Sequence, residues 1–342
     1  TGGGVVVSGA TATNNVIQGN YSGLDRTGTA DLGNGGDGVS VQASARNNLI
    51  GGTTPAERNV IAGNTGSGVR IYSTYTDFNT VSGNYIGTNA AGTANIGNAG
   101  QGVELDGVSG NIIGSLTSGG GNLISGNAGD GVLVENGGDG NLIFGNTIVA
   151  NGEEGIQVWG GAINTVIGHS TPAARNIISG NAMQGIGIYG ITSGTVVRGN
   201  WIGVAADGVT AQGNGKQGIH VSQASSVMIG GSNPGEGNII ANAGALHPGV
   251  SLSDGANGVV IIGNSIYGSS SLGIDLDGDW VTANDPGDAD VGSNNLQNTP
   301  ELLSALLTGS DIALSGTLNS LANTRFRIDF FANPGPHASG YG

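Results

Sequence analysis

The chain carries few basic side chains that could remove a proton from a substrate. Lys216 is the sole lysine, and His220 follows it four residues later. Arg198 is the other basic group near Lys216 and His220 in the sequence. Asp275 begins an acidic stretch further along the chain. A lysine or histidine can act as a general base, and a carboxylate can assist it. If the protein is catalytic, the sequence favours Lys216, His220 and Asp275 as the reacting groups.

Six aspartates within sixteen residues form the second chemical signal: Asp275, Asp277, Asp279, Asp285, Asp288 and Asp290. Carboxylates in this number suit Ca²⁺ if they converge. The first three mimic the opening of an EF-hand loop, but Trp280 and Pro286 stand where such a loop has glycine and glutamate. The EF-hand interpretation therefore fails. Ca²⁺ is the one ion that we expect this stretch could bind, and we expect that the protein requires no cofactor. The alternative interpretation of the stretch is a polar, solvated cap and linker.

Aromatic and arginine side chains form a third group of candidates. Aromatic rings can stack on sugars, and Tyr72, Tyr75, Trp159, Tyr189, Trp201 and Trp280 are expected at the surface. Arg58 and Arg175 occupy equivalent positions in two similar loops. They either bind a sugar or a partner, or anchor their loops to neighbouring carbonyl or acidic groups.

The composition excludes several classes of function. The 342 residues carry a formal net charge of −15 and include no cysteine. Nucleic-acid binding needs a basic patch, and anionic membranes attract basic segments, so neither partner is expected. No apolar stretch reaches the ~20 residues of a membrane span, and no disulfide framework is possible. The chain begins at Thr1, so we expect a mature or excised piece of a protein.

One short phrase recurs throughout the chain: Gly, Val or Ile, any residue, then Val, Ile or Leu. Ten copies begin at Gly4, Gly38, Gly68, Gly102, Gly131, Gly155, Gly185, Gly218, Gly249 and Gly273. Two further strand-like phrases, ended by Gly-Asn or Gly-Gly, lie in each interval. Glycine and asparagine tolerate the left-handed backbone of sharp corners. The repeat therefore predicts an all-β stack of about nine to ten three-strand coils.

Stacking of the coils predicts which residues share a face. The residues on either side of the variable position point inward, and the variable position points outward. The outward column reads Val6, Ser40, Arg70, Glu104, Leu133, Gln157, Gly187, His220, Ser251 and Asp275. Arg70 and Glu104 are expected to form a weak surface salt bridge. His220 and Asp275 lie two coils, or roughly 10 Å, apart, and no carboxylates are expected to cluster on this face before Asp275.

Two further expectations concern the corners and the end of the stack. Asn48, Asn111, Asn164 and their equivalents are expected to form hydrogen-bonded ladders. The predicted domains are a solenoid over 1–280, an acidic linker or cap over 281–300 and a β-strand tail over 301–342. Strands are predicted over 311–318 and 325–331, and the tail is either a truncated β-sandwich or a C-terminal cap.

The motif from Asn48 to Asn64 recurs from Asn164 to Asn181. With the coil pattern over about residues 4–280, it resembles right-handed parallel β-helix repeats of the pectin-lyase-like class, as found in long repetitive bacterial surface or secreted proteins. The resemblance implies a right-handed parallel β-helix. It leaves activity open, because the class includes lyases, hydrolases, epimerases and adhesins.

These observations favour a non-catalytic structural or adhesive solenoid, located outside a bacterial cell or on its surface. The alternatives are a polysaccharide lyase or epimerase that uses Lys216, His220 and Asp275, and a polysaccharide-binding module. The module would use Tyr72, Trp159, Tyr189, Trp201, Arg58 and Arg175. The expected partner is a polysaccharide or a cell-surface molecule, and exposed coil ends allow end-to-end self-association.

Overall fold

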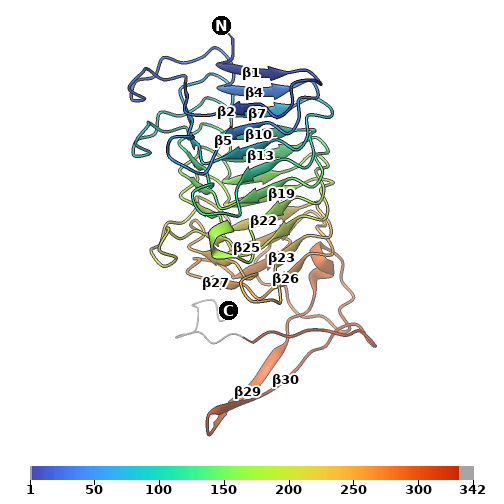
Figure 1. Ribbon diagram of the computed structural model, residues 1–342. Coiled ribbons are helices and arrows are strands. Elements are labelled where there is room, and N and C mark those ends of the chain that lie inside the picture. Colours follow the sequence, from blue (N-terminus) through green and yellow to red (C-terminus); the bar gives the residue numbers. More distant parts are fainter. Residues whose placement is uncertain (1, 331–342) are drawn as a thin grey trace.

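The computed structural model describes residues 2–330, and it is a parallel β-solenoid of about nine turns (Figure 1). Three parallel sheets run along the stack, and each coil contributes one short strand to each sheet. The predicted all-β stack of three-strand coils is confirmed. Within residues 2–330, no helix is long and apolar enough to cross a membrane.

The first sheet has ten strands, which are the ten glycine-led phrases. They are β1 (Val5–Ser8), β4 (Val39–Gln42), β7 (Val69–Tyr72), β10 (Val103–Asp106), β13 (Val132–Glu135), β16 (Ile156–Val158), β19 (Ile186–Tyr189), β22 (Ile219–Ser222), β25 (Val250–Ser253) and β28 (Ile274–Leu276).

The second sheet has nine strands of two or three residues. They are β2 (Val16–Ile17), β5 (Leu49–Gly51), β8 (Thr80–Ser82), β11 (Ile112–Gly114), β14 (Leu142–Phe144), β17 (Val166–Ile167), β20 (Val196–Val197), β23 (Met228–Gly230) and β26 (Val260–Ile262).

The third sheet also has nine strands, and two short 3₁₀ helices lie outside the sheets. The strands are β3 (Tyr21–Ser22), β6 (Val60–Ile61), β9 (Tyr85–Ile86), β12 (Leu123–Ser125), β15 (Thr147–Val149), β18 (Ile177–Ser179), β21 (Trp201–Ile202), β24 (Ile239–Ala241) and β27 (Ser265–Tyr267), and the helices are η1 (Pro172–Ala174) and η2 (Ser293–Leu296).

The core is a stack of aliphatic side chains that no single coil could bury. Val103, Leu105, Ile113 and Ile124, from the three sides of one coil, are all fully buried. Full burial of one such side chain contributes about 1.5–3 kcal/mol. Because the partners of each side chain lie in the coils above and below it, stability comes from contacts between neighbouring coils.

The glycines serve two different purposes. Gly83, which precedes a corner asparagine, has a φ of +67°, as expected for a sharp corner. Gly68, which begins a first-sheet phrase, is needed for space: a Cβ there would lie 2.5 Å from a methyl group of Ile86 and 2.7 Å from the carbonyl oxygen of Gly102. The repeated glycine thus allows each corner to approach the coil that follows.

Asparagine ladders hold all three corners of the coil over much of the stack, and the longest buried ones run through Asn84 and Asn127. Asn84 donates to Asn122 Oδ1 at 3.1 Å, and Asn122 donates to Asn146 Oδ1 at 2.9 Å. The predicted ladder through Asn48 and Asn111 is present as well. Asn164 is not one of its rungs, because the equivalent position is the buried Thr165 and Asn164 instead donates to Asp139. The prediction for Asn164 was wrong by one residue.

A two-stranded antiparallel hairpin follows the solenoid. It pairs β29 (Glu301–Thr308) with β30 (Asp311–Thr317), and Figure 1 shows it projecting below the last coil. The predicted strand over 311–318 is therefore confirmed at β30. The strand predicted over 325–331 is absent from residues 325–330, which have no regular secondary structure, while Phe331 lies outside the described residues.

Candidate functional site

Three columns of side chains make up the outer surface of the first sheet and its edge. The register places Arg70 beside Glu104, and Gln157, Gly187 and His220 beside one another, so the predicted outward column is confirmed. A second column, two residues further on, contains Tyr72, Asp106, Glu135, Trp159, Tyr189, Ser222 and Ser253. A third column, directly before the repeated glycine, contains Asp130, Glu154 and Gln184.

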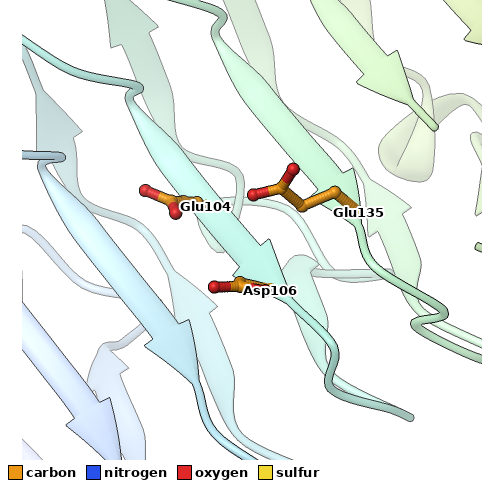
Figure 2. A group of neighbouring side chains, drawn as sticks. All are labelled: Glu104, Asp106 and Glu135. Carbon is orange, nitrogen blue, oxygen red and sulfur yellow. The ribbon is translucent and has the colours of Figure 1, made fainter. Parts of the chain in front are cut away.

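Three carboxylates meet on this surface (Figure 2). Glu104 and Asp106 project from β10 and Glu135 from β13, and their carboxylate oxygens lie within 4.8 Å of one another. The prediction that no carboxylates cluster here before Asp275 is therefore wrong. It considered one outward column, whereas this cluster joins two columns on adjacent strands.

Arg70 supplies the positive charge beside this cluster. Its Nε lies 2.9 Å from Glu104 Oε1, and its Nη2 lies 3.0 Å from Asp106 Oδ2. The predicted Arg70–Glu104 salt bridge is thus confirmed and extended to Asp106. Burial raises the pKa of Glu104, although Ser67 and Arg70 oppose that change. One guanidinium among three carboxylates leaves this part of the surface acidic.

Aromatic rings flank the carboxylates along the second column. The indole N–H of Trp159 donates to Glu135 Oε2 at 2.7 Å, while 45% of the residue remains exposed. Tyr72 lies three strands away, or about 14 Å. Its ring lies 4.6 Å from the guanidinium carbon of Arg70, and its hydroxyl is bonded to Gln42. Tyr72, Asp106, Glu135 and Trp159 therefore form a strip with a ring at each end and hydrogen-bond acceptors between.

A second acidic group is buried at the edge of the same surface. Asp130 and Glu154 are 1% and 5% exposed, and the exposed Glu153 completes the group. Asp130 Oδ1 accepts the backbone N–H of Glu154 at 3.0 Å. Burial raises the pKa of Asp130 to about 8, and the nearby Glu154 carboxyl adds to this effect. Burial and mutual repulsion therefore favour a protonated form of the Asp130–Glu154 pair.

Tyr189 and His220 lie beside this buried pair. The Tyr189 hydroxyl donates to Glu154 Oε1 at 3.1 Å, and burial, with Glu154, raises the pKa of Tyr189. The Tyr189 ring contacts the His220 ring edge-to-face, with centroids 5.5 Å apart. His220 Nδ1 faces Gln184 Nε2 at 3.4 Å, and His220 Nε2 faces Ser253 Oγ at 3.0 Å.

The predicted trio of Lys216, His220 and Asp275 does not converge. His220 and Asp275 are separated by Ser251 on the intervening strand, as expected from the coil spacing. Burial lowers the pKa of His220, and the charge of the nearby Lys216 acts in the same direction. Asp275 is buried, and its pKa is raised by burial and by the charge of Asp279. The sheet therefore presents His220 with Gln184 and Ser253 rather than with Asp275.

The two loop arginines cover aromatic rings of the third sheet. The guanidinium carbon of Arg175 lies 4.2 Å from the Trp201 ring centroid, and that of Arg58 lies 3.9 Å from the Tyr85 centroid. Each Nε also donates to a backbone carbonyl, at 3.1 Å for Arg175 and 3.3 Å for Arg58. Their geometry is that of loop anchors, and one side of Trp201 is already occupied.

The aspartates after β28 divide into two groups. Asp285, Asp288 and Asp290 bring carboxylate oxygens within 4.8 Å of one another, whereas Asp277 accepts from Ser293. Asp288 already accepts the backbone N–H of Asn298 at 2.7 Å and bonds to the Ser320 hydroxyl. Binding of Ca²⁺ by these aspartates stays a prediction, which a calcium titration of the melting temperature would test.

Several functional candidates were missed by sequence reasoning: Asp130, Glu154, Gln184 and Ser253 at one end of the surface, and Asp106 and Glu135 at the other. These residues could have been found from the sequence by their fixed positions relative to the repeated glycine, because residues at the same position in successive coils lie side by side. Asp130, Glu154 and Gln184 each directly precede it, and Asp106, Glu135 and Ser253 each follow it by four residues.

No family model matches the chain, and no curated protein matches it. A solved structure of a variant of the periplasmic alginate epimerase AlgG is 16% identical, with a TM-score of 0.47; the match covers 71% of this chain and 57% of that one. The A-module of the mannuronan C-5 epimerase AlgE4 from Azotobacter vinelandii is 15% identical, with a TM-score of 0.34 and coverage of 78% and 83%. Neither similarity carries an inference about activity.

Proposed function

We propose that the protein binds a polysaccharide along the outer face of the first sheet. The observation that carries the proposal is the exposed Trp159 ring, held by Glu135 beside the carboxylates of Asp106 and Glu104. An aromatic ring offers a flat apolar surface for a sugar ring, and carboxylates accept hydrogen bonds from sugar hydroxyls. Tyr72 extends the strip to four neighbouring strands, β7, β10, β13 and β16.

The charge of this surface selects among glycans. The net charge of −15 and the acidic cluster repel a polyuronate. A neutral polysaccharide avoids this repulsion and supplies hydroxyl donors. The same binding would serve a structural or adhesive role outside a bacterial cell, and that location stays a prediction.

Binding is tested by calorimetric titration with a panel of neutral polysaccharides and one polyuronate. Trp159→Ala is expected to weaken binding at least tenfold. Trp280→Ala is the matched control, because Trp280 is also exposed, at 54%, but lies beyond the last strand of the first sheet. Equal affinity for the wild type and Trp159→Ala, or preference for the polyuronate without added calcium, would overturn the proposal. Product analysis in the same mixtures tests the lyase and epimerase alternative.

A further inference from the structure

Ser253 and His220 form a contact that the proposed binding role does not require. They lie on the neighbouring strands β25 and β22, and both side chains point to the outer face of the first sheet. Both are half-buried, and His220 Nε2 is 3.0 Å from Ser253 Oγ. A serine hydroxyl within hydrogen-bond reach of an imidazole is the arrangement of an activated oxygen nucleophile.

The second nitrogen of the imidazole has a partner as well. Gln184 Nε2 lies 3.4 Å from His220 Nδ1, and the Gln184 side chain belongs to a residue that is 5% exposed. Gln184 Oε1 is buried and has no hydrogen-bond partner among residues 2–330. Rotation of the amide by half a turn exchanges its oxygen and nitrogen. The oxygen then accepts a hydrogen bond from Nδ1–H, and in this tautomer Nε2 is free to accept a hydrogen bond from the Ser253 hydroxyl.

The surroundings orient the imidazole and favour its neutral form. The edge-to-face contact with Tyr189 restrains the ring. Burial lowers the pKa of His220, and the charges of Lys216 and His247 act in the same direction, while Asp254 and Glu154 oppose them. A neutral imidazole at pH 7 is the form that can remove a proton. The Ser253 hydroxyl can also donate to Asp254 Oδ2, at 3.0 Å, instead of to His220. We take this second hydrogen bond as the state of the site without substrate.

We propose that Ser253 is the nucleophile and His220 the general base of an ester-hydrolysing site, with Gln184 as the positioning residue. Ser253 Oγ attacks the carbonyl carbon of a carboxylic ester while its proton moves to His220 Nε2. The bond to the alcohol oxygen breaks, and that oxygen takes the proton from His220. Water then attacks the acyl-serine, again losing a proton to His220, and the acid leaves as the Ser253 hydroxyl is restored.

The position of Ser253 suggests what the ester belongs to. Trp159, Tyr189, Ser222 and Ser253 follow one another on successive strands of the second column, so Trp159 and Ser253 are three strands, or about 14 Å, apart. A glycan lying on the Trp159 strip would bring an O-acyl substituent to Ser253. The sugar part of this assignment rests on the proposed function, whereas the assignment of the nucleophile does not.

The experiment uses a fluorophosphonate probe, with peptide mapping of the labelled residue, and hydrolysis of p-nitrophenyl acetate. Ser253→Ala is expected to abolish labelling. Ser253→Ala and His220→Gln, each as a single variant, are expected to lower kcat/KM for the ester at least about 100-fold. Ser8→Ala is the matched control, because Ser8 holds the same outward position on β1, and no histidine is bonded to it in residues 2–330. Circular dichroism and melting curves establish that each variant is folded.

Gln184→Glu tests the positioning residue separately. A carboxylate beside Nδ1 favours the imidazolium, so the acid limb of the kcat/KM profile is expected to move to higher pH. Labelling of a serine other than Ser253, or the absence of both labelling and hydrolysis in folded wild-type protein, would overturn the inference. Labelling of Ser253 in a protein that binds no glycan would leave the inference intact and refute the proposed function.

Discussion

The ring of Tyr189 lies in the space that Gly187 leaves on the outer face of the first sheet. A Cβ at Gly187 would collide with the ring and hydroxyl of Tyr189. The glycine is therefore what allows the phenol to lie flat and reach Glu154 at 3.1 Å. A missing side chain in one column thus creates a hydrogen bond between the two columns beside it.

Gly187→Ala is expected to displace the Tyr189 ring, because the far end of a side chain moves more easily than the backbone. The displaced phenol would lose its burial and its contact with Glu154, which are the causes of its raised pKa. Absorbance at 295 nm during an alkaline titration should then show one additional tyrosine that ionises near pH 10. The double variant Gly187→Ala/Tyr189→Phe should lack this additional ionisation, which would assign it to Tyr189. Identical titrations of the wild type and Gly187→Ala would contradict the arrangement.

Asp130→Asn is expected to change how stability depends on pH. The pKa of Asp130 is about 8 in the folded protein, against 3.8 for an ordinary aspartate. Between these values the folded state binds more protons than the unfolded chain, so this group makes stability fall as pH rises from about 4 to about 8. Asparagine does not titrate, so the variant should gain stability relative to the wild type at pH 8 and little at pH 4.

Melting temperatures of wild type and Asp130→Asn at pH 4, 6 and 8 provide the measurement. Asp139→Asn serves as a control on an exposed carboxylate. A constant difference between wild type and Asp130→Asn at all three values would show that Asp130 is ionised in the folded protein.

Asn146→Ala should remove one buried rung of a corner ladder. Asn146 donates to Ile113 O at 2.9 Å and to Asn176 Oδ1 at 3.1 Å, and it accepts from Asn122 at 2.9 Å. The orphaned groups are buried, so the free energy of unfolding is expected to fall by about 3 kcal/mol. Asn20→Ala, at the exposed first rung of the same ladder, should cost less than about 1 kcal/mol. Urea unfolding measures both, and equal losses would argue against the ladder as a buried support.

Arg175→Ala should uncover the indole of Trp201. Loss of the stacked guanidinium is expected to shift the tryptophan emission to longer wavelength and to lower stability by about 1 kcal/mol. Arg58→Ala removes the equivalent contact from Tyr85, so it should lower stability similarly without shifting the tryptophan emission. An unchanged emission spectrum for Arg175→Ala would show that the ring remains covered by other groups.

The regular parts of the molecule could be predicted because stacking repeats one environment many times. Val103 and Leu105 point inward for the same reason as their equivalents in every coil, so a count from the repeated glycine assigns their face. The Arg70–Glu104 pair followed from the same count, since it joins one position on adjacent coils.

The candidate sites escaped prediction because they depend on diagonal contacts. The approach of Glu104 to Glu135 joins two columns on adjacent strands. The Arg70–Asp106 ion pair and the approach of His220 to Ser253 cross between columns in the same way. Such contacts depend on side-chain length and direction, which the repeat does not encode. Asn164 failed differently: the register is unchanged, but Thr165 occupies the ladder position, and Asn164 takes the positive-φ corner position that Gly140 holds in the preceding coil.

The stacking of coils also makes the solenoid a molecular ruler. Trp159 and Ser253 are separated by whole strands, so gain or loss of one coil between them would change their separation in steps of about 4.8 Å. Each repeat begins and ends at the same corner, which allows duplication or deletion of a unit to preserve the register of the remainder. Evolution can therefore adjust the distance between two positions on this face in fixed increments, without redesigning either one.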